Sequence, residues 1–306
     1  MKIFVFGGTG FIGSALSSAL INKGYEVIVF TRNAHRPKPI KDDKFQFVQW
    51  DNFSTQILLE QFKGEYGIVN LAGEPIGPKP WTKMRKRKIL ESRVTITQKI
   101  SEVIVKANVK PAFVLQGSAV GFYGDRPIEK LYEQAPKGTG FMPDVVDQWE
   151  KALEMEIEFG IRVVYTRLGI VLGKNSGIFR IMTLPFRLWF GGYVGSGQQY
   201  TSWIHIRDVI NAMSFLIEDQ RAQGIYNLTA PNPLKMKDFS AILARKLKKP
   251  NWFHLPKFLL KITFGQMAEE LLLASQEVYP ERLVKMGFKF DFPTLGLALD
   301  EILKKD

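Results

Sequence analysis

A glycine turn near the start of the chain constrains the fold more than any other feature. Residues 2–6 (KIFVF) form a short apolar run, and residues 7–13 (GGTGFIG) lead into a segment, 11–23, with apolar side chains at helical spacing. This order predicts a buried parallel strand, a tight turn and a helix. The turn places bare N–H groups at a helix N-terminus, where the macrodipole favours an anion such as a pyrophosphate. A purely structural turn is the alternative.

The end of the second expected strand bears on the choice of dinucleotide. Residues 25–30 (YEVIVF) are rich in β-branched and aromatic side chains, and Thr31 and Arg32 follow them. About 20 residues past the glycines, NAD-specific folds usually carry an acid for the ribose 2′-hydroxyl, and no acid stands here. Arg32 offers a planar, permanently charged group that suits a 2′-phosphate. The sequence therefore favours NADP, with a solvent-facing arginine as the alternative.

Strands and helices alternate through the first part of the chain. Further strands are expected at 45–50, 67–71, 112–116 and 161–166, and helices at 58–62, 83–107 and 145–159. Such alternation predicts a parallel sheet with right-handed crossovers and a binding site along the carboxyl ends of its strands. Asp51, the segment 70–74 (NLAGE) and Ser118 all stand at such ends.

The pattern changes in the second half. Residues 179–190 (FRIMTLPFRLWF) are apolar and interrupted by Pro185, which predicts a lid or wall over a cleft, or an interface, rather than a core helix. A strand at 203–207, a helix at 208–217 and a strand at 224–228 return to the sheet. Beyond residue 231 only helices are expected, at 236–247, 256–264, 268–274, 280–286 and 294–303.

The expected fold is an α/β protein with a doubly wound parallel Rossmann sheet and a smaller, mostly helical C-terminal lobe. Residues 1–230 would form the nucleotide-binding domain, with 174–204 contributing to the substrate lobe, and residues 231–306 the C-terminal lobe. The natural substrate site is the cleft between them.

The amino-acid composition limits which kinds of catalytic site, metal site and partner we expect. The chain of 306 residues has no cysteine, and its three histidines show no ligand spacing, so we expect neither disulfides, thiolate catalysis nor a metal site. No stretch is long and apolar enough to span a bilayer and no export signal is visible, so a cytoplasmic location without a membrane partner is expected. The net charge of +12 includes the run 83–88 (KMRKRK), read as a solvated helix face or as a source of anion attraction. A nucleic-acid partner is not expected, because no nucleic-acid motif accompanies the run.

Several motifs together resemble a known family. GGTGFIG, NLAGEPI, SAVGFYG, WEKA, RLGIVLG, WIHIRDV and the C-terminal LLLASQEVYPERLVKMGFKF are similar to the atypical, epimerase-like group of extended short-chain dehydrogenases/reductases. The resemblance covers essentially the whole chain. It implies an NADP-binding Rossmann domain followed by a characteristic C-terminal helical segment.

The resemblance also implies roles for individual residues. The cofactor pyrophosphate would lie against the glycine turn, the 2′-phosphate beside Thr31 and Arg32, the adenine at Asp51, and the nicotinamide ribose at the exit of the fourth strand. His205 and Asp208 match a motif that we interpret as mainly structural. The cofactor-binding residues beyond Thr31, Arg32 and Asp51 are Gly7, Gly10, Phe11, Ile12, Gly13, Leu71, Ala72, Gly73 and Glu74.

The catalytic pattern departs from the family. Active relatives place a Tyr-x-x-x-Lys pair on the helix after the fifth strand, where the lysine lowers the tyrosine pKa for proton exchange with substrate. Residues 145–151 read VVDQWEK and contain no tyrosine. Ser118 matches the serine that holds the substrate oxygen, and Tyr123 is the candidate substitute acid. We therefore expect an NADP-dependent oxidoreductase or epimerase-like enzyme acting on an unknown small molecule. The alternative is a non-catalytic, NADPH-binding regulatory protein, and the oligomeric state is left open.

Overall fold

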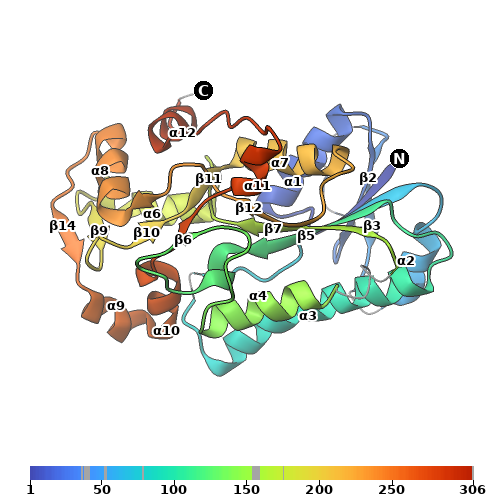
Figure 1. Ribbon diagram of the computed structural model, residues 1–306, viewed down its shortest axis with the longest axis horizontal. Coiled ribbons are helices and arrows are strands. Elements are labelled where there is room, and N and C mark those ends of the chain that lie inside the picture. The colour runs from blue at the N-terminus through green and yellow to red at the C-terminus, as the bar shows by residue number, and fades with distance from the viewer. Residues whose placement is uncertain are drawn as a thin grey trace.

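A seven-stranded sheet crosses the middle of the molecule (Figure 1). The computed structural model describes residues 1–304 apart from 36, 38–41, 52–53, 78, 154–158 and 175. Every pairing within the large sheet is parallel. In sheet order the strands are β12 (Gly224–Leu228), β7 (Arg162–Leu168), β5 (Phe113–Ala119), β4 (Tyr66–Asn70), β1 (Lys2–Phe6), β2 (Glu26–Thr31) and β3 (Phe45–Gln49).

Helices cover both faces of this sheet, which explains why its central strands are nearly continuous apolar runs. The helices α1 (Phe11–Asn22) and α7 (Ile206–Glu218) bury their apolar sides on one face. The helices α2 (Thr55–Gln61) and α3 (Lys83–Lys106) do so on the other. The strand order reverses its direction of growth at β1, so the crevice for a ligand is expected beside the turn that follows β1. The predicted doubly wound α/β fold is confirmed.

The expected helix at 145–159 begins earlier than predicted. Helix α4 (Phe141–Lys151) starts before Pro143, which lies in its first turn, where a missing N–H is tolerated. The carboxylate of Glu270 accepts hydrogen bonds from Phe141 N at 2.9 Å and from Met142 N at 2.7 Å. A side chain far away in the sequence therefore caps this helix. Residues 154–158 of the predicted helix lie outside the described residues.

The expected break at Pro185 does not occur, whereas the role of this segment as a wall, lid or interface stays a prediction. Helix α6 (Gly177–Arg187) runs through Pro185, which removes one intrahelical hydrogen bond, to the residue four positions earlier, without ending the helix. Phe179 and Phe186 are buried in a cluster with α8 (Met236–Leu247), so one face of α6 does belong to the core.

The C-terminal region is mostly helical, as predicted, but its predicted lack of strands is wrong. Three short strands alternate with its helices and pair with earlier parts of the chain: β13 with β10, β14 with β9, and β15 with β6. Strands this short leave too little alternation to be recognised from sequence. Their bounds are β13 (Leu234–Lys235), β10 (Tyr200–Thr201), β14 (Phe253–Leu255), β9 (Gly192–Val194), β15 (Glu277–Val278) and β6 (Lys130–Leu131).

The remaining elements complete the fold. Strands β8 (Ile170–Leu172) and β11 (Trp203–His205) form a small parallel pair, and the 3-10 turn η1 (Val120–Tyr123) follows β5 directly. The other C-terminal elements are α9 (Lys257–Phe264), α10 (Gln266–Ala268), the π-turn η2 (Glu269–Leu273), α11 (Glu281–Lys285) and α12 (Leu295–Ile302).

Candidate functional site

The sheet brings the predicted site residues to one edge. Phe6 at the end of β1 is in register with Phe30 on β2 and with Asn70 on β4, and Asn70 is in register with Gln116 on β5. Along the carboxyl ends of neighbouring strands the order is therefore Arg32, the glycine turn, the exit of β4 and Ser118. This is the edge where doubly wound folds bind ligands.

Gly7, Gly10 and Gly13 of the turn have different surroundings. A side chain at Gly7 would start 2.6 Å from the backbone of Leu71, and one at Gly13 would start 2.3 Å from the carbonyl oxygen of Gly7. The packing of the chain itself therefore excludes any side chain at these two positions. Among the described residues, a Cβ added at Gly10 would meet only the Gly7 carbonyl oxygen, at 3.3 Å, and φ of Gly10 is an ordinary −81°. Gly10 is exposed, and the fold alone does not demand a glycine there.

The start of α1 offers bare amides. Its N-cap is Gly10, which has no side chain to accept a hydrogen bond, and its first turn contains no acidic residue. The N–H groups of Phe11, Ile12 and Gly13 have no acceptor within the helix, because the first amides of any helix lack one. The electrostatics of this position favour an anionic ligand.

Arg32 stands exposed just after β2. Its guanidinium has no hydrogen-bond or ion-pair partner among the described residues, although its charge contributes to lowering the pKa of Glu74. Asp51 follows β3, whose Gln49 is in register with Thr31, so Asp51 and Arg32 follow adjacent strand ends. The Asp51 carboxylate accepts a hydrogen bond from Ser54 N at 3.1 Å, and Ser54 is the N-cap of α2. Asp51 therefore supports this loop, and contact with an adenine stays a prediction.

The exit of β4 packs directly against the glycine turn. Asn70, which is buried, donates to Thr97 Oγ1 and to Gln116 Oε1, both at 2.9 Å, and accepts from Ala72 N at 3.2 Å. These bonds fix the path of Leu71 and Ala72 beside Gly7. The side chain of Asn70 thus shapes this loop, a role that the sequence analysis missed.

Glu74 faces basic side chains of α3. Its carboxylate lies 2.6 Å from Arg85 Nη1 and 3.8 Å from Lys88 Nζ, and the hydrogen bond from Arg85 lowers the pKa of Glu74. Arg93 donates to the backbone oxygen of Glu74 at 3.0 Å, and burial lowers the pKa of Arg93 to about 10. The basic run at 83–88 is therefore partly engaged at the site edge and is not only a solvated helix face.

Ser118 belongs to a buried charged cluster. Its hydroxyl donates to Glu150 Oε1, and Arg167 holds both carboxylate oxygens of Glu150, with Nε at 2.8 Å and Nη2 at 2.7 Å. Arg167 is 1% exposed and stacks over the Phe122 ring with 3.5 Å from Cζ to the centroid. Ser118 and Arg167 are in register on β5 and β7, whereas Glu150 comes from α4. The sequence analysis missed Glu150 and Arg167, although Glu150 stands inside the quoted WEKA motif.

Tyr123 is closed off in this arrangement. Its side chain is completely buried in η1, and its hydroxyl donates to Asn227 Oδ1 at 2.7 Å. Burial raises the pKa of Tyr123, and the nearby charge of Arg167 offsets only part of that effect. The Tyr123 hydroxyl is therefore held as a neutral donor to Asn227.

His205 and Asp208 serve the fold. His205 Nδ1 accepts from Arg207 N at 3.2 Å as the N-cap of α7, and burial lowers the pKa of His205 to about 4. Asp208 accepts from Asp291 N at 2.8 Å and from Phe292 N at 3.0 Å, tying α7 to the C-terminal segment. Both contacts agree with the structural role expected for this motif.

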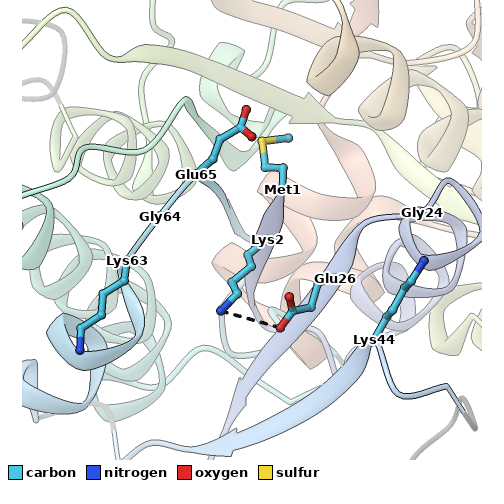
Figure 2. A pocket seen from close by; sticks show the side chains of 8 residues that line it. All are labelled: Met1, Lys2, Gly24, Glu26, Lys44, Lys63, Gly64 and Glu65. Carbon is cyan, nitrogen blue, oxygen red and sulfur yellow. Dashed lines mark ion pairs between the residues drawn. The ribbon is translucent and has the colours of Figure 1, made fainter.

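A depression of about 550 Å³ lies at the amino-terminal ends of the strands, lined by residues such as Lys2, Glu26 and Lys63 (Figure 2). It is open and lies at the edge opposite to the glycine turn. Within the described ranges no group of three or more histidines and acids could hold a metal ion. No described helix combines the length and apolar character that crossing a bilayer requires.

The chain is similar to several proteins described as epimerases or epimerase family proteins. The Bacillus subtilis epimerase family protein YfhF is 34% identical over 99% of this chain and 98% of that protein. The crystal structure of the human epimerase family protein SDR39U1 (isoform 2) with NADPH has a TM-score of 0.87 at 32% identity, over 99% of both chains. That of a nucleoside-diphosphate sugar epimerase from Corynebacterium glutamicum has a TM-score of 0.79 at 30% identity, over 99% of this chain and 58% of that one.

Two family models match separate parts of the chain. The model of the NAD dependent epimerase/dehydratase family matches residues 3–229, and that of a domain of unknown function, DUF1731, matches residues 255–302. The predicted resemblance to the epimerase-like group is confirmed. The chain therefore belongs to the NAD-dependent epimerase/dehydratase family and carries a C-terminal DUF1731 domain.

Proposed function

We propose that the carboxyl edge of the sheet binds NADP(H) and that the protein is an NADP-dependent oxidoreductase or epimerase-like enzyme for a small molecule. The observation that carries the nucleotide part is Gly10. Gly10 is the exposed N-cap of α1 and has no side chain, although the fold has room for a Cβ there after a small shift. A pyrophosphate accepting from the amides of Phe11 and Ile12 would explain this glycine, because it must approach the backbone closely. The NADPH in the human relative's crystal structure supports this choice.

Arg32 supports NADP over NAD. The guanidinium is exposed and free of hydrogen-bond and ion-pair partners among the described residues. It stands where a 2′-phosphate would lie if the pyrophosphate occupies the glycine turn. The neighbouring Thr31 and Asn33 are uncharged and would not repel that phosphate. The Arg32 fork can hold two phosphate oxygens at once, which a lysine cannot do.

The reaction centre would lie where the β4 exit meets Ser118. Leu71, Ala72 and Gly73 would line the nicotinamide ribose, and the bound cofactor would supply or accept a hydride there. In alcohol oxidation, a substrate hydroxyl would donate to Ser118 Oγ, and Glu150 would receive the proton that the serine passes on. Arg167 holds both oxygens of Glu150 and so orients the carboxylate beside Ser118. Turnover would be slow, because helix α4 carries no tyrosine that could act as the proton donor.

A second candidate function is a non-catalytic NADPH-binding regulator. The burial of the two candidate catalytic side chains favours it: Ser118 is only 2% exposed and Tyr123 has no exposed surface. Helix α4 also lacks a tyrosine that could act as the proton donor. In this alternative, bound NADPH would hold the two parts of the chain together and so present a surface to a partner.

Calorimetry tests the cofactor assignment. NADPH should bind more tightly than NADH, and Arg32→Ala should remove most of the difference, roughly 10- to 150-fold for a charge-assisted contact of about 1.5–3 kcal/mol. Lys63→Ala is the matched control, because it removes a charge at the opposite edge of the sheet and should leave both affinities unchanged. Equal affinities of the wild-type protein for NADPH and NADH would contradict the assignment.

A screen of NADPH oxidation against a carbonyl library separates the two functions. An enzyme should turn over at least one compound slowly, and Ser118→Ala should lower that rate by roughly 10²- to 10⁴-fold. Tyr123→Phe tests the substitute acid and should have little effect, because its hydroxyl is engaged by Asn227. Binding of NADPH without turnover of any compound would favour the regulator. Rapid turnover unaffected by the serine substitution would refute this reaction centre.

A further inference from the structure

Two segments of the chain contain basic residues and no acidic ones. Residues 174–207 include four Lys or Arg, residues 239–268 include six, and neither segment has an Asp or Glu. The structure joins them: β9 pairs with β14, and the amides of Trp252 and Phe253 both donate to the Gly191 oxygen at 3.1 Å. Both strands and helix α9 lie at the end of the molecule farthest from β3 and α2 (Figure 1).

Exposed aromatic side chains gather at this junction. Trp189, Phe190, Trp252 and Phe253 are 60%, 57%, 63% and 41% exposed, and we call them the aromatic cluster. The Phe190 ring lies 6.3 Å from the rings of both Trp252 and Phe253, and Trp252 Nε1 donates to the Trp189 oxygen at 3.0 Å. The ammonium of Lys249 lies 3.9 Å from the centroid of the Trp189 ring. The cluster is therefore contiguous and carries positive charge.

The apolar exposure extends beyond the cluster. Phe258 and Ile262, one helical turn apart on α9, are 60% and 80% exposed. The two acid-free segments hold eleven of the nineteen exposed large hydrophobic side chains among the described residues. A contiguous apolar patch of this kind marks a surface that contacts something else.

The backbone of Trp189 is strained. Its φ is +68°, a region that bulky L-residues rarely adopt. Trp189 N donates to the Phe186 oxygen at 3.0 Å and Phe190 N to the Pro185 oxygen at 2.9 Å, the pattern that usually ends a helix on a glycine. A tryptophan occupies this glycine position and projects into solvent. Although the ring contacts Lys249, the side chain stays 60% exposed, so the strain gains little packing; this points to a role outside the fold.

The charge pattern selects the occupant. A second copy of the chain would bring like charges together across a symmetric contact. Single-stranded nucleic acid binds through charge and aromatic stacking and would leave the exposed aliphatic side chains of α9 without a partner. A bilayer with anionic headgroups matches both features, because Trp and Phe enter the interfacial region while Lys and Arg meet the headgroups. We propose that the aromatic cluster, with Lys249 and the exposed face of α9, docks the protein on an anionic membrane surface. The proposal replaces the sequence-based expectation of no membrane partner, which rested on the lack of a spanning segment.

Vesicle co-sedimentation tests the proposal on the full chain. The protein should bind vesicles of phosphatidylglycerol with phosphatidylcholine, bind phosphatidylcholine alone far more weakly, and dissociate at high salt. Tryptophan emission should shift to shorter wavelength on binding. This shift reports Trp189 and Trp252, because the other four tryptophans are at most 9% exposed.

Two substitutions locate the contact. Trp189→Gly should weaken vesicle partitioning by about tenfold, while thermal unfolding stays unchanged or rises because glycine suits the positive φ. Lys249→Glu should weaken partitioning by about 25-fold, since each charge near an anionic surface is worth about fivefold. Ile128→Ser is the matched control: this side chain is 94% exposed outside the two segments, and its loss should leave partitioning unchanged.

Three results would overturn the proposal. The first is failure of the protein to bind anionic vesicles. The second is an equal loss of partitioning for Ile128→Ser and Trp189→Gly, which would indicate non-specific adsorption. The third is a dimer in solution that Trp189→Gly dissociates and that excludes vesicles, which would assign the cluster to a second copy of the chain.

Discussion

Two glycine-to-alanine substitutions in the glycine turn can distinguish the requirements of the fold from those of ligand binding. At Gly13 an added Cβ would lie 2.3 Å from the Gly7 oxygen and 2.7 Å from Gly8 Cα, so Gly13→Ala must move backbone. At Gly10 the same atom lies 3.3 Å from the Gly7 oxygen, which needs a shift of a few tenths of an ångström. We expect Gly10→Ala to change the free energy of unfolding by no more than about 1 kcal/mol, because poorer N-capping is offset by a less flexible unfolded chain.

The expected effect on binding is much larger. A Cβ at Gly10 would occupy the space of the pyrophosphate and weaken its bonds to the amides of Phe11 and Ile12. Losing one or two charge-assisted hydrogen bonds costs about 1.5–3 kcal/mol each, which corresponds to roughly 10- to 10⁴-fold in affinity. The larger side chain of Gly10→Val should abolish binding of NADPH and NADH alike.

Thermal unfolding and calorimetric titration with NADPH check both variants. Gly10→Ala should melt close to the wild-type protein and bind weakly, whereas Gly13→Ala should melt well below it. Wild-type affinity for NADPH in a folded Gly10→Val protein would refute the placement of the pyrophosphate. Unfolding of Gly10→Ala would indicate that the turn has a structural role only.

Three further outcomes are expected. Glu150→Gln should lower any turnover, because the amide can neither take the proton from Ser118 in alcohol oxidation nor return it in carbonyl reduction; unchanged kinetics would exclude the carboxylate from the proton path. The pKa of His205 in the folded state is about 4, below the usual 6.5, because the buried imidazole is held neutral. The stability that neutral His205 contributes is therefore complete above pH 6.5 and is lost as the pH falls toward 4, lowering the free energy of unfolding by up to about 3 kcal/mol. His205→Asn keeps the helix cap and should remove this loss in urea unfolding at several pH values; identical curves would contradict the reasoning. Glu270→Ala should lower the free energy of unfolding by about 1–3 kcal/mol, because two amides at the start of α4 lose their acceptor. Substitution of the exposed neighbour, Glu269→Ala, should lower it by less than about 1 kcal/mol in the same urea assay, and equal losses would argue against the cap.

Local pattern was enough to predict most of the sheet and the glycine turn. The strand at 2–6 and the helix at 236–247 have the bounds that the sequence predicts, because apolar periodicity and flanking residues mark them locally. The break expected at Pro185 does not occur, because the proline removes only one intrahelical hydrogen bond and core packing of Phe179 and Phe186 holds the helix on both sides of it. Pairs such as β6 with β15 join two-residue strands far apart in the chain, which no local pattern records.

Candidate site residues that belong to a local motif could be named from the sequence, whereas those that only the fold brings together could not. The glycines and Arg32 stand at fixed distances from their strands, so counting residues was sufficient. Glu150 and Arg167 become partners only because α4 packs beside the ends of β5 and β7. Their types are ordinary for a helix and a strand end, and only the three-dimensional contact distinguishes them.

The cap on α4 has a consequence for how the chain acquires its structure during synthesis. Glu270 follows Phe141 by 129 residues, so at about 5–20 residues per second the ribosome needs roughly 6–26 s to produce the carboxylate that completes the helix start. During that interval the nascent Rossmann sheet can form, while the first turn of α4 lacks its partner. The start of the helix that carries Glu150 is therefore completed only after Glu270 has emerged, later than the last strand of the sheet on which this helix packs.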